Sequence, residues 1–134
     1  MSKPYALVVE DNKINSLLVN KLLQKQGWHV MNAYDGEMAL DLFKQYNFQL
    51  ICMDVQLPLI DGYEVTKQIR QLEQGTGKKT AIMALTAYAM KGDREKCLAA
   101  GMDDYISKPI EINYFLQKTI VYYGRNRDEK NCSC

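Results

Sequence analysis

The chain has 134 residues, a hydrophobic fraction of 47% and a formal net charge of +1. This length fits one domain with a single hydrophobic core. The near-neutral charge argues against non-specific nucleic-acid binding, which needs a strongly basic surface. No apolar run approaches the roughly 18 to 20 residues of a membrane span. Since no signal-peptide core precedes the first strand-like run, we expect a cytosolic protein.

Apolar runs of strand length alternate with segments of helical periodicity along the whole chain. The strand-like runs are 5–9, 28–33, 49–53, 80–85 and 104–107. The helical segments are 13–26, 37–46, 63–73, 90–100 and 112–123. This alternation predicts an α/β fold: a doubly wound, five-stranded parallel sheet in the order 2-1-3-4-5, with helices on both faces.

The helical segments carry apolar residues at i, i+3 and i+4 spacing, which predicts one buried face on each. Asn12 is expected to cap the first helix and Gly27 to end it. The residues expected on the buried face of the first helix are Ile14, Leu17, Leu18, Leu22 and Leu23. Those expected on the last helix are Ile112, Phe115, Leu116, Ile120 and Tyr123.

The run 50–53 ends on a carboxylate, Asp54, and Pro58 and the pair Asp61-Gly62 indicate a loop after it. Four consecutive apolar residues are typical of a strand buried on both faces, as in a parallel sheet. Ligands bind at the carboxyl ends of such strands. Asp54 is therefore either a turn-capping residue or part of a binding site.

Polar residues end the other strands as well: Glu10-Asp11 the first, Thr86 the fourth and Lys108 the fifth. In the predicted strand order these ends meet at one edge of the sheet. Two carboxylates about 5 Å apart repel by roughly 3 kcal/mol at an effective dielectric near 20, so one lysine cannot hold three of them ionised. Carboxylate oxygens favour Mg²⁺. An ion held opposite Lys108 would form a binding site for a phosphoryl group. Asp54 would then be a metal ligand only, or also the nucleophile.

These residues resemble the receiver domain of two-component response regulators, over about residues 4–124. The resemblance rests on the acid pair Glu10-Asp11, on Asp54 with Pro58 and Asp61-Gly62, on the stretch 84–87 and on Lys108-Pro109. The sequences of 9–12, with Asn15, and of 53–58 are especially similar to those of receivers that are attached to, or work with, hybrid histidine kinases.

The resemblance implies a role for each site residue. Asp54 would accept a phosphoryl group from a phosphohistidine on a histidine kinase or histidine phosphotransfer protein. Mg²⁺, with Mn²⁺ as a substitute, would be bound by the side chains of Asp11 and Asp54, by the backbone carbonyl of Gln56, and by Glu10 through water. Lys108 would pair with the phosphoryl oxygens, Thr86 would move its hydroxyl onto them, and Tyr105 would turn inward in step. The Lys108-Pro109 bond is typically cis in this family.

Two departures from the common pattern stand out. Glu10 replaces the more usual Asp, and its longer arm is expected to preserve metal binding. Gln56 and Tyr88 occupy the two positions that tune hydrolysis of the acyl phosphate in this family. Because a bulky Tyr88 obstructs an attacking water, we expect a long-lived phosphorylated state. The protein would be a signalling switch that catalyses only its own phosphoryl transfer and slow autodephosphorylation, with its output face on the fourth helix, fifth strand and fifth helix.

Three other classes of protein share parts of this pattern. An aspartyl phosphatase of another class requires a second Asp two residues after the nucleophile, where this chain has Gln56. A dinucleotide-binding domain is excluded because the first strand–helix turn has no glycine and carries two acids. A pseudo-receiver, which binds partners without phosphorylation, usually lacks one of the acids, the threonine or the lysine, and all are present here.

We expect residues 1–124 to form the receiver domain and 125–134 a polar, disordered tail, with Cys132 and Cys134 in it. Cys52 and Cys97 are expected to be reduced and buried. The tail after residue 124 is too short for an effector domain, so we expect either a stand-alone regulator, which Met1 slightly favours, or a domain of a larger kinase. We expect the downstream target to be a protein, and we expect no nucleic-acid or membrane partner.

Overall fold

Strands and helices alternate along the chain in this computed structural model, which describes residues 3–87 and 92–123. Within these residues the strands are β1 (Tyr5–Val9), β2 (His29–Ala33), β3 (Phe48–Asp54), β4 (Ala81–Thr86) and β5 (Asp104–Ser107). The helices are α1 (Lys13–Gln26), α2 (Gly36–Gln45), α3 (Gly62–Glu73), α4 (Asp93–Ala100) and α5 (Ile112–Ile120). The predicted order of elements is confirmed.

The strands form one parallel sheet in the order β2-β1-β3-β4-β5, as predicted. Its register aligns the carboxyl ends of the central strands, because Val9 pairs with Met53 and Asp54 pairs with Leu85. Thr86 pairs with Ser107 at the end of β5. The register therefore brings the residues that end β1, β3, β4 and β5 to one edge of the sheet.

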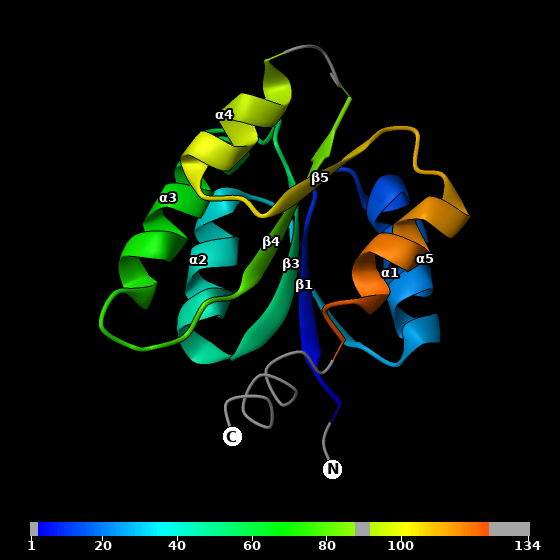
Figure 1. Cartoon of the computed structure of the whole chain (residues 1–134), viewed down its shortest axis with the longest axis horizontal. Helices are drawn as coiled ribbons and strands as arrows, with labels where there is room; N and C mark the ends of the chain where they lie inside the picture. The colour runs from blue at the N-terminus through cyan, green and yellow to red at the C-terminus, as the bar shows by residue number, and fades with distance from the viewer. Residues whose placement is uncertain (1–2, 88–91, 124–134) are drawn as a thin grey trace.

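Helices cover both faces of the sheet. Figure 1 shows α1 and α5 on one side and α2, α3 and α4 on the other. Side chains of the buried central strands alternate between two hydrophobic clusters: Leu7 and Ile51 pack toward α2 and α3, whereas Val8 and Cys52 pack toward α1 and α5. Because β1 and β3 are apolar on both faces, they can lie only in the middle of such a sandwich.

Helix ends follow from local side-chain chemistry. The Asn12 side chain accepts hydrogen bonds from the backbone N–H groups of Ile14 and Asn15, at 2.9 and 3.1 Å, so the predicted cap is confirmed. Asp61 caps α3 by accepting from the N–H of Glu64 at 2.9 Å. Gly27 ends α1 in the left-handed conformation, with a φ of 104°.

The predicted buried faces of the helices are partly wrong. In α1 the side chains of Ile14, Leu17 and Leu18 are 77%, 55% and 39% exposed, because the helix turns Ser16, Val19, Leu22 and Leu23 to the sheet instead. In α5 Ile112 and Ile120 are about half exposed and Thr119 is buried, its hydroxyl donating to the carbonyl of Phe115 at 2.8 Å. That bond lets a polar residue occupy a core position.

Several boundaries also differ from the prediction. Asp54 is the last residue of β3, and Trp28 is buried before β2 begins. Helix α5 ends at Ile120, and a turn continues to residue 123. Cys52 and Cys97 are free and buried, as expected. The expected tail and the start predicted for the fourth helix at Met90 lie outside the described residues.

Candidate functional site

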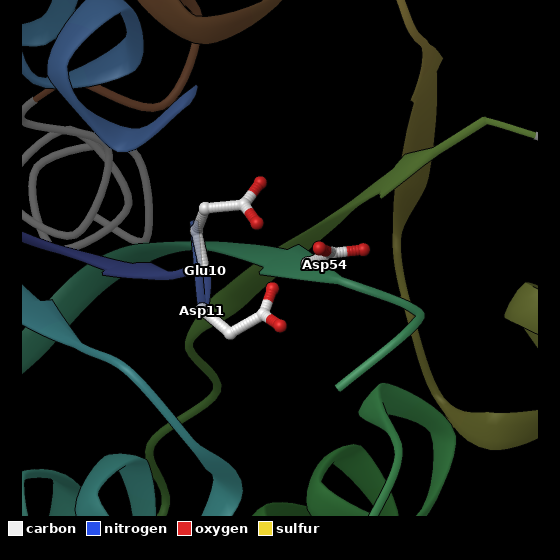
Figure 2. A group of neighbouring side chains, drawn as sticks. All are labelled: Glu10, Asp11 and Asp54. Atoms are coloured by element: carbon white, nitrogen blue, oxygen red, sulfur yellow. The ribbon is translucent and has the colours of Figure 1, made fainter. Parts of the chain in front are cut away.

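Three carboxylates meet where β1 and β3 end. Glu10 and Asp11 follow β1 directly, and Asp54 ends β3, its neighbour in the sheet. One carboxylate oxygen of each lies within 4.8 Å of the others, and Figure 2 shows the three groups turned to the same side of the strand ends. Glu10 and Asp54 are only 2% and 5% exposed, while Asp11 faces solvent. The predicted acidic cluster is confirmed as a geometric feature.

Lys108 reaches this cluster from the far side of β4. Its backbone N–H donates to the carbonyl of Thr86 at 2.7 Å, and the Lys108-Pro109 peptide bond is cis, as the resemblance implied. Its Nζ lies 2.9 Å from Glu10 Oε1 and 3.2 Å from Asp54 Oδ2. Because β4 lies between β5 and β3, only a long side chain can span this gap.

Backbone N–H groups hold two of the carboxylates in place. The N–H of Gln56 donates to Asp54 Oδ1 at 3.0 Å, and the N–H of Asn12 donates to Glu10 Oε2 at 3.2 Å. Each carboxylate therefore has one oxygen bonded to backbone and the other facing Lys108. The backbone bond and the lysine contact together fix the orientation of both carboxylates.

Burial and charge shift the ionisation of the site. Burial raises the pKa of the Glu10 carboxyl, the neighbouring Asp54 raises it further, and Lys108 offsets part of the shift. Burial alone would lower the pKa of Lys108, but its bonds to Glu10 and Asp54 outweigh that effect and raise it. The site therefore favours the protonated form of Lys108, and it also favours the neutral form of Glu10 more than solvent does.

The remaining predicted residues lie around this centre. Thr86 ends β4 and is 3% exposed. Tyr105 lies in β5, three residues before Lys108. It is partly buried and packs against the hydrophobic cluster between the sheet and helices α2 and α3. Gln56 is exposed, two residues after Asp54. Tyr88 lies outside the described residues, so the expectation attached to it stays a prediction.

An apolar groove beside the site was missed from the sequence. It has a volume of about 290 Å³ and is lined by Glu10, Ile14, Leu18, Lys108, Pro109 and Ile110, among others. Sequence periodicity assigned Ile14 and Leu18 to the core, whereas the fold leaves them on the surface next to the acids. The available signal was Ile14, a large apolar residue in the first turn of α1, three residues after Asp11.

A doubly wound α/β sheet that gathers acids and one lysine at its carboxyl edge defines a class of phosphate-handling α/β proteins. A family model described as "Response regulator receiver domain" matches residues 6–120. The chain therefore belongs to the response regulator receiver family, whose members are signalling switches of two-component phosphorelays.

The chain is similar in sequence to one curated relative and in structure to two solved receiver domains. The chain is 45% identical over 109 residues to Hybrid signal transduction histidine kinase I of Dictyostelium discoideum; the match covers 78% of this chain and 6% of that kinase. It resembles a chain of the co-crystal structure of Saccharomyces cerevisiae Ypd1, a histidine phosphotransfer signaling protein, with the Ssk1 receiver domain. That match has a TM-score of 0.81, 34% identity, and coverage of 93% and 91%.

The second structure is the receiver domain of sensor histidine kinase PA1611 from Pseudomonas aeruginosa, with magnesium coordinated in the active-site cleft. The TM-score is 0.78 at 38% identity, covering 91% of this chain and 98% of that one. Mg²⁺ is thus bound within this family. No helix among the described residues is long and apolar enough to span a membrane.

Proposed function

We propose that this chain accepts a phosphoryl group on Asp54 from a phosphohistidine of a histidine kinase or a histidine phosphotransfer protein. The observation that carries the proposal is the shared lysine: Nζ of Lys108 lies 2.9 Å from Glu10 and 3.2 Å from Asp54, inside a group of three carboxylates. A carboxylate at that position is a nucleophile, and the lysine beside it is a ready partner for phosphoryl oxygens.

In the transfer step an oxygen of Asp54 attacks phosphorus. A P–O bond forms, the P–N bond to the histidine breaks, and its electron pair returns to the imidazole ring. The backbone N–H of Gln56 holds the other oxygen of Asp54 at 3.0 Å and so orients the attack. Lys108 then exchanges Asp54 for the phosphoryl oxygens, and the hydroxyl of Thr86 moves onto them.

The donor set fits Mg²⁺, because three carboxylates within 4.8 Å of one another carry excess negative charge on hard oxygen ligands. Asp11 and Asp54 would bind the ion by side chain, Gln56 by its backbone carbonyl and Glu10 through water. When bound, the ion neutralises charge on the carboxylates and on the incoming phosphoryl group. Mn²⁺, which prefers the same oxygen ligands, is expected to substitute.

The test is incubation with acetyl phosphate, read as intact mass. With Mg²⁺ present we expect a gain of one phosphoryl group, and no gain when a chelator removes the ion. Absence of labelling in a protein shown to bind Mg²⁺ would restrict the donor to a protein phosphohistidine, which phosphorylated Ypd1 tests directly. Failure with both donors would leave a pseudo-receiver, a module that binds partners without phosphorylation.

The groove beside Lys108 suggests where the phosphohistidine partner docks. Exposed apolar side chains of Ile14 and Leu18 border the site itself, so a partner that covers them also excludes water from Asp54. We expect Ile14→Ser to slow phosphoryl transfer from Ypd1 about tenfold, since buried apolar anchors dominate such interfaces. Labelling by acetyl phosphate should stay unchanged.

Leu72→Ser is the matched control. Leu72 is an exposed aliphatic residue of the same size as Ile14, and it lies on α3, away from the site. Equal slowing in both variants would exclude docking at this groove. Slowing with acetyl phosphate as well would indicate damage to the site rather than loss of a docking contact.

The output surface is assigned to α4, β5 and α5. Helix α4 has eight residues, buries only Cys97 and Ala100, and has Gly92 at its N-cap position, which provides no side-chain cap. An element with so few packed side chains is the one most easily repositioned by added charge at Asp54. We therefore expect phosphorylation to change amide hydrogen exchange over residues 93–114 and to leave β1 unchanged. Unaltered exchange over 93–114 in labelled protein would contradict this assignment.

A further inference from the structure

A second cavity lies at the opposite edge of the sheet from Asp54. It has a volume of about 270 Å³ and opens between the end of α2, the start of β3, and the loop 74–80 that links α3 to β4. That loop is at the lower left of Figure 1, below α3. Since β3 separates the two edges by its seven residues, about 20 Å at 3.3 Å per residue, this cavity is distinct from the phosphorylation site.

Aromatic and aliphatic side chains form its walls. Phe43, Tyr46 and Phe48 line one side, with the rings of Tyr46 and Phe48 6.2 Å apart between centroids. Leu72 lines the other side and is 41% exposed. Walls of this kind accept a flat ring by stacking and apolar contact.

The polar groups of Glu73 and Thr80 in the cavity already have hydrogen-bond partners within the protein. Glu73 carries the single carboxylate among the described lining residues, and both of its oxygens are engaged. One accepts from Arg70 at 2.7 Å and the other from the N–H of Thr80 at 2.6 Å. The hydroxyl of Thr80 donates to the carbonyl of Phe48 at 2.9 Å. This carboxylate therefore neither attracts a cation nor leaves an unpaired charge.

Three lysines at the mouth give the cavity an excess of positive charge. Lys78 donates to Asn47 at 2.7 Å, a neutral partner that leaves its charge uncompensated. Lys44 has no ion pair with any residue the structure describes, and Lys79 has only a 3.4 Å pair with Asp103 at 71% exposure. Exposed pairs of this length contribute little, so the lysines remain available to an anion.

From these contacts we propose that the cavity binds a small aromatic carboxylate, with its ring against Tyr46 and Leu72 and its carboxylate at Lys44 and Lys78. A monoanion fits better than a phosphate dianion, because α2 and α3 both end here and helix carboxyl ends repel a doubly charged group more strongly than a singly charged one. The volume suits one or two fused rings rather than a larger ligand.

Three probes separate ring from charge in an amide chemical-shift titration: 2-naphthoate, the uncharged 2-naphthalenemethanol, and inorganic phosphate. We expect saturable shifts from 2-naphthoate confined to residues 43–48 and 72–80, with weaker binding of the alcohol and none of phosphate. The double substitution Lys44→Gln and Lys78→Gln should weaken naphthoate binding about fivefold and leave the alcohol unchanged, as expected for two exposed ion pairs.

The control pair is Lys21→Gln and Lys25→Gln, two lysines of α1 on the other face of the sheet, which should bind as wild type. Tyr46→Ser should weaken both naphthyl probes, because Tyr46 is 38% exposed and supplies ring contact. Asp54→Asn should bind naphthoate unchanged, since the two sites are independent. The proposal is overturned by shifts outside these segments, by no saturation up to about 5 mM, or by equal affinity for acid and alcohol.

Discussion

Asp54→Asn is expected to abolish phosphoryl incorporation from both acetyl phosphate and phosphorylated Ypd1. A carboxamide oxygen lacks the charge that makes the carboxylate a nucleophile. Of the two acids beside it, Glu10 is engaged by Lys108 and by the N–H of Asn12, and Asp11 is the proposed Mg²⁺ ligand. Intact mass after incubation with Mg²⁺ and donor measures the effect. A remaining gain of one phosphoryl group would assign the acceptor to another residue.

The variant should remain folded, so that loss of labelling reports chemistry. The charge of Asp54 is attracted by Lys108 at 3.2 Å and repelled by Glu10 and Asp11 within 4.8 Å. At an effective dielectric near 20 these contributions largely cancel, and the free energy of unfolding should change by no more than about 2 kcal/mol.

Asp61→Asn is the matched control, because Asp61 is an exposed acid on the same loop whose side chain caps α3. Asparagine caps as well as aspartate, so both labelling and stability should match the wild type. Loss of labelling in both variants would point to general damage of the loop.

Gly62→Ala is expected to destabilise the fold by about 3 kcal/mol and to slow labelling of Asp54. A Cβ at position 62 would collide with the backbone carbonyl oxygen of Asp54 and press on Met53 and Val55. Backbone cannot yield as a side-chain end can, and the N–H of Gly62 is held to the carbonyl of Val55 at 2.9 Å. Chemical denaturation measures the loss of stability, and intact mass over time measures the slower labelling.

Gly75→Ala provides the comparison, because a Cβ there meets nothing within 4 Å. Its φ of 80° still costs about 1 kcal/mol for a residue with a side chain. Labelling of this variant should be normal. If Gly62→Ala proved no more destabilising than Gly75→Ala, the close approach of α3 to the end of β3 would be refuted.

Much of the site could be predicted because a parallel sheet collects strand ends. Once the apolar runs were read as strands, Glu10, Asp11, Asp54, Thr86 and Lys108 had to meet at one edge, and the register confirms this. The pairing of Lys108 with both Glu10 and Asp54 was not predictable in that way. It depends on how far one side chain extends across β4, which no spacing in the sequence encodes.

The sequence by itself determined the alternation of strands and helices, the helix cap at Asn12 and the polar strand ends, since each depends on neighbouring residues. Only the tertiary structure decided which helix faces are covered. Ile14 and Leu18 match the core period yet are exposed, whereas Thr119 is polar yet buried. A helical period allows several rotations about the helix axis, and packing against a particular sheet face selects one of them. That selection, together with the loop 74–80 folding against α2, created both cavities beside the sheet.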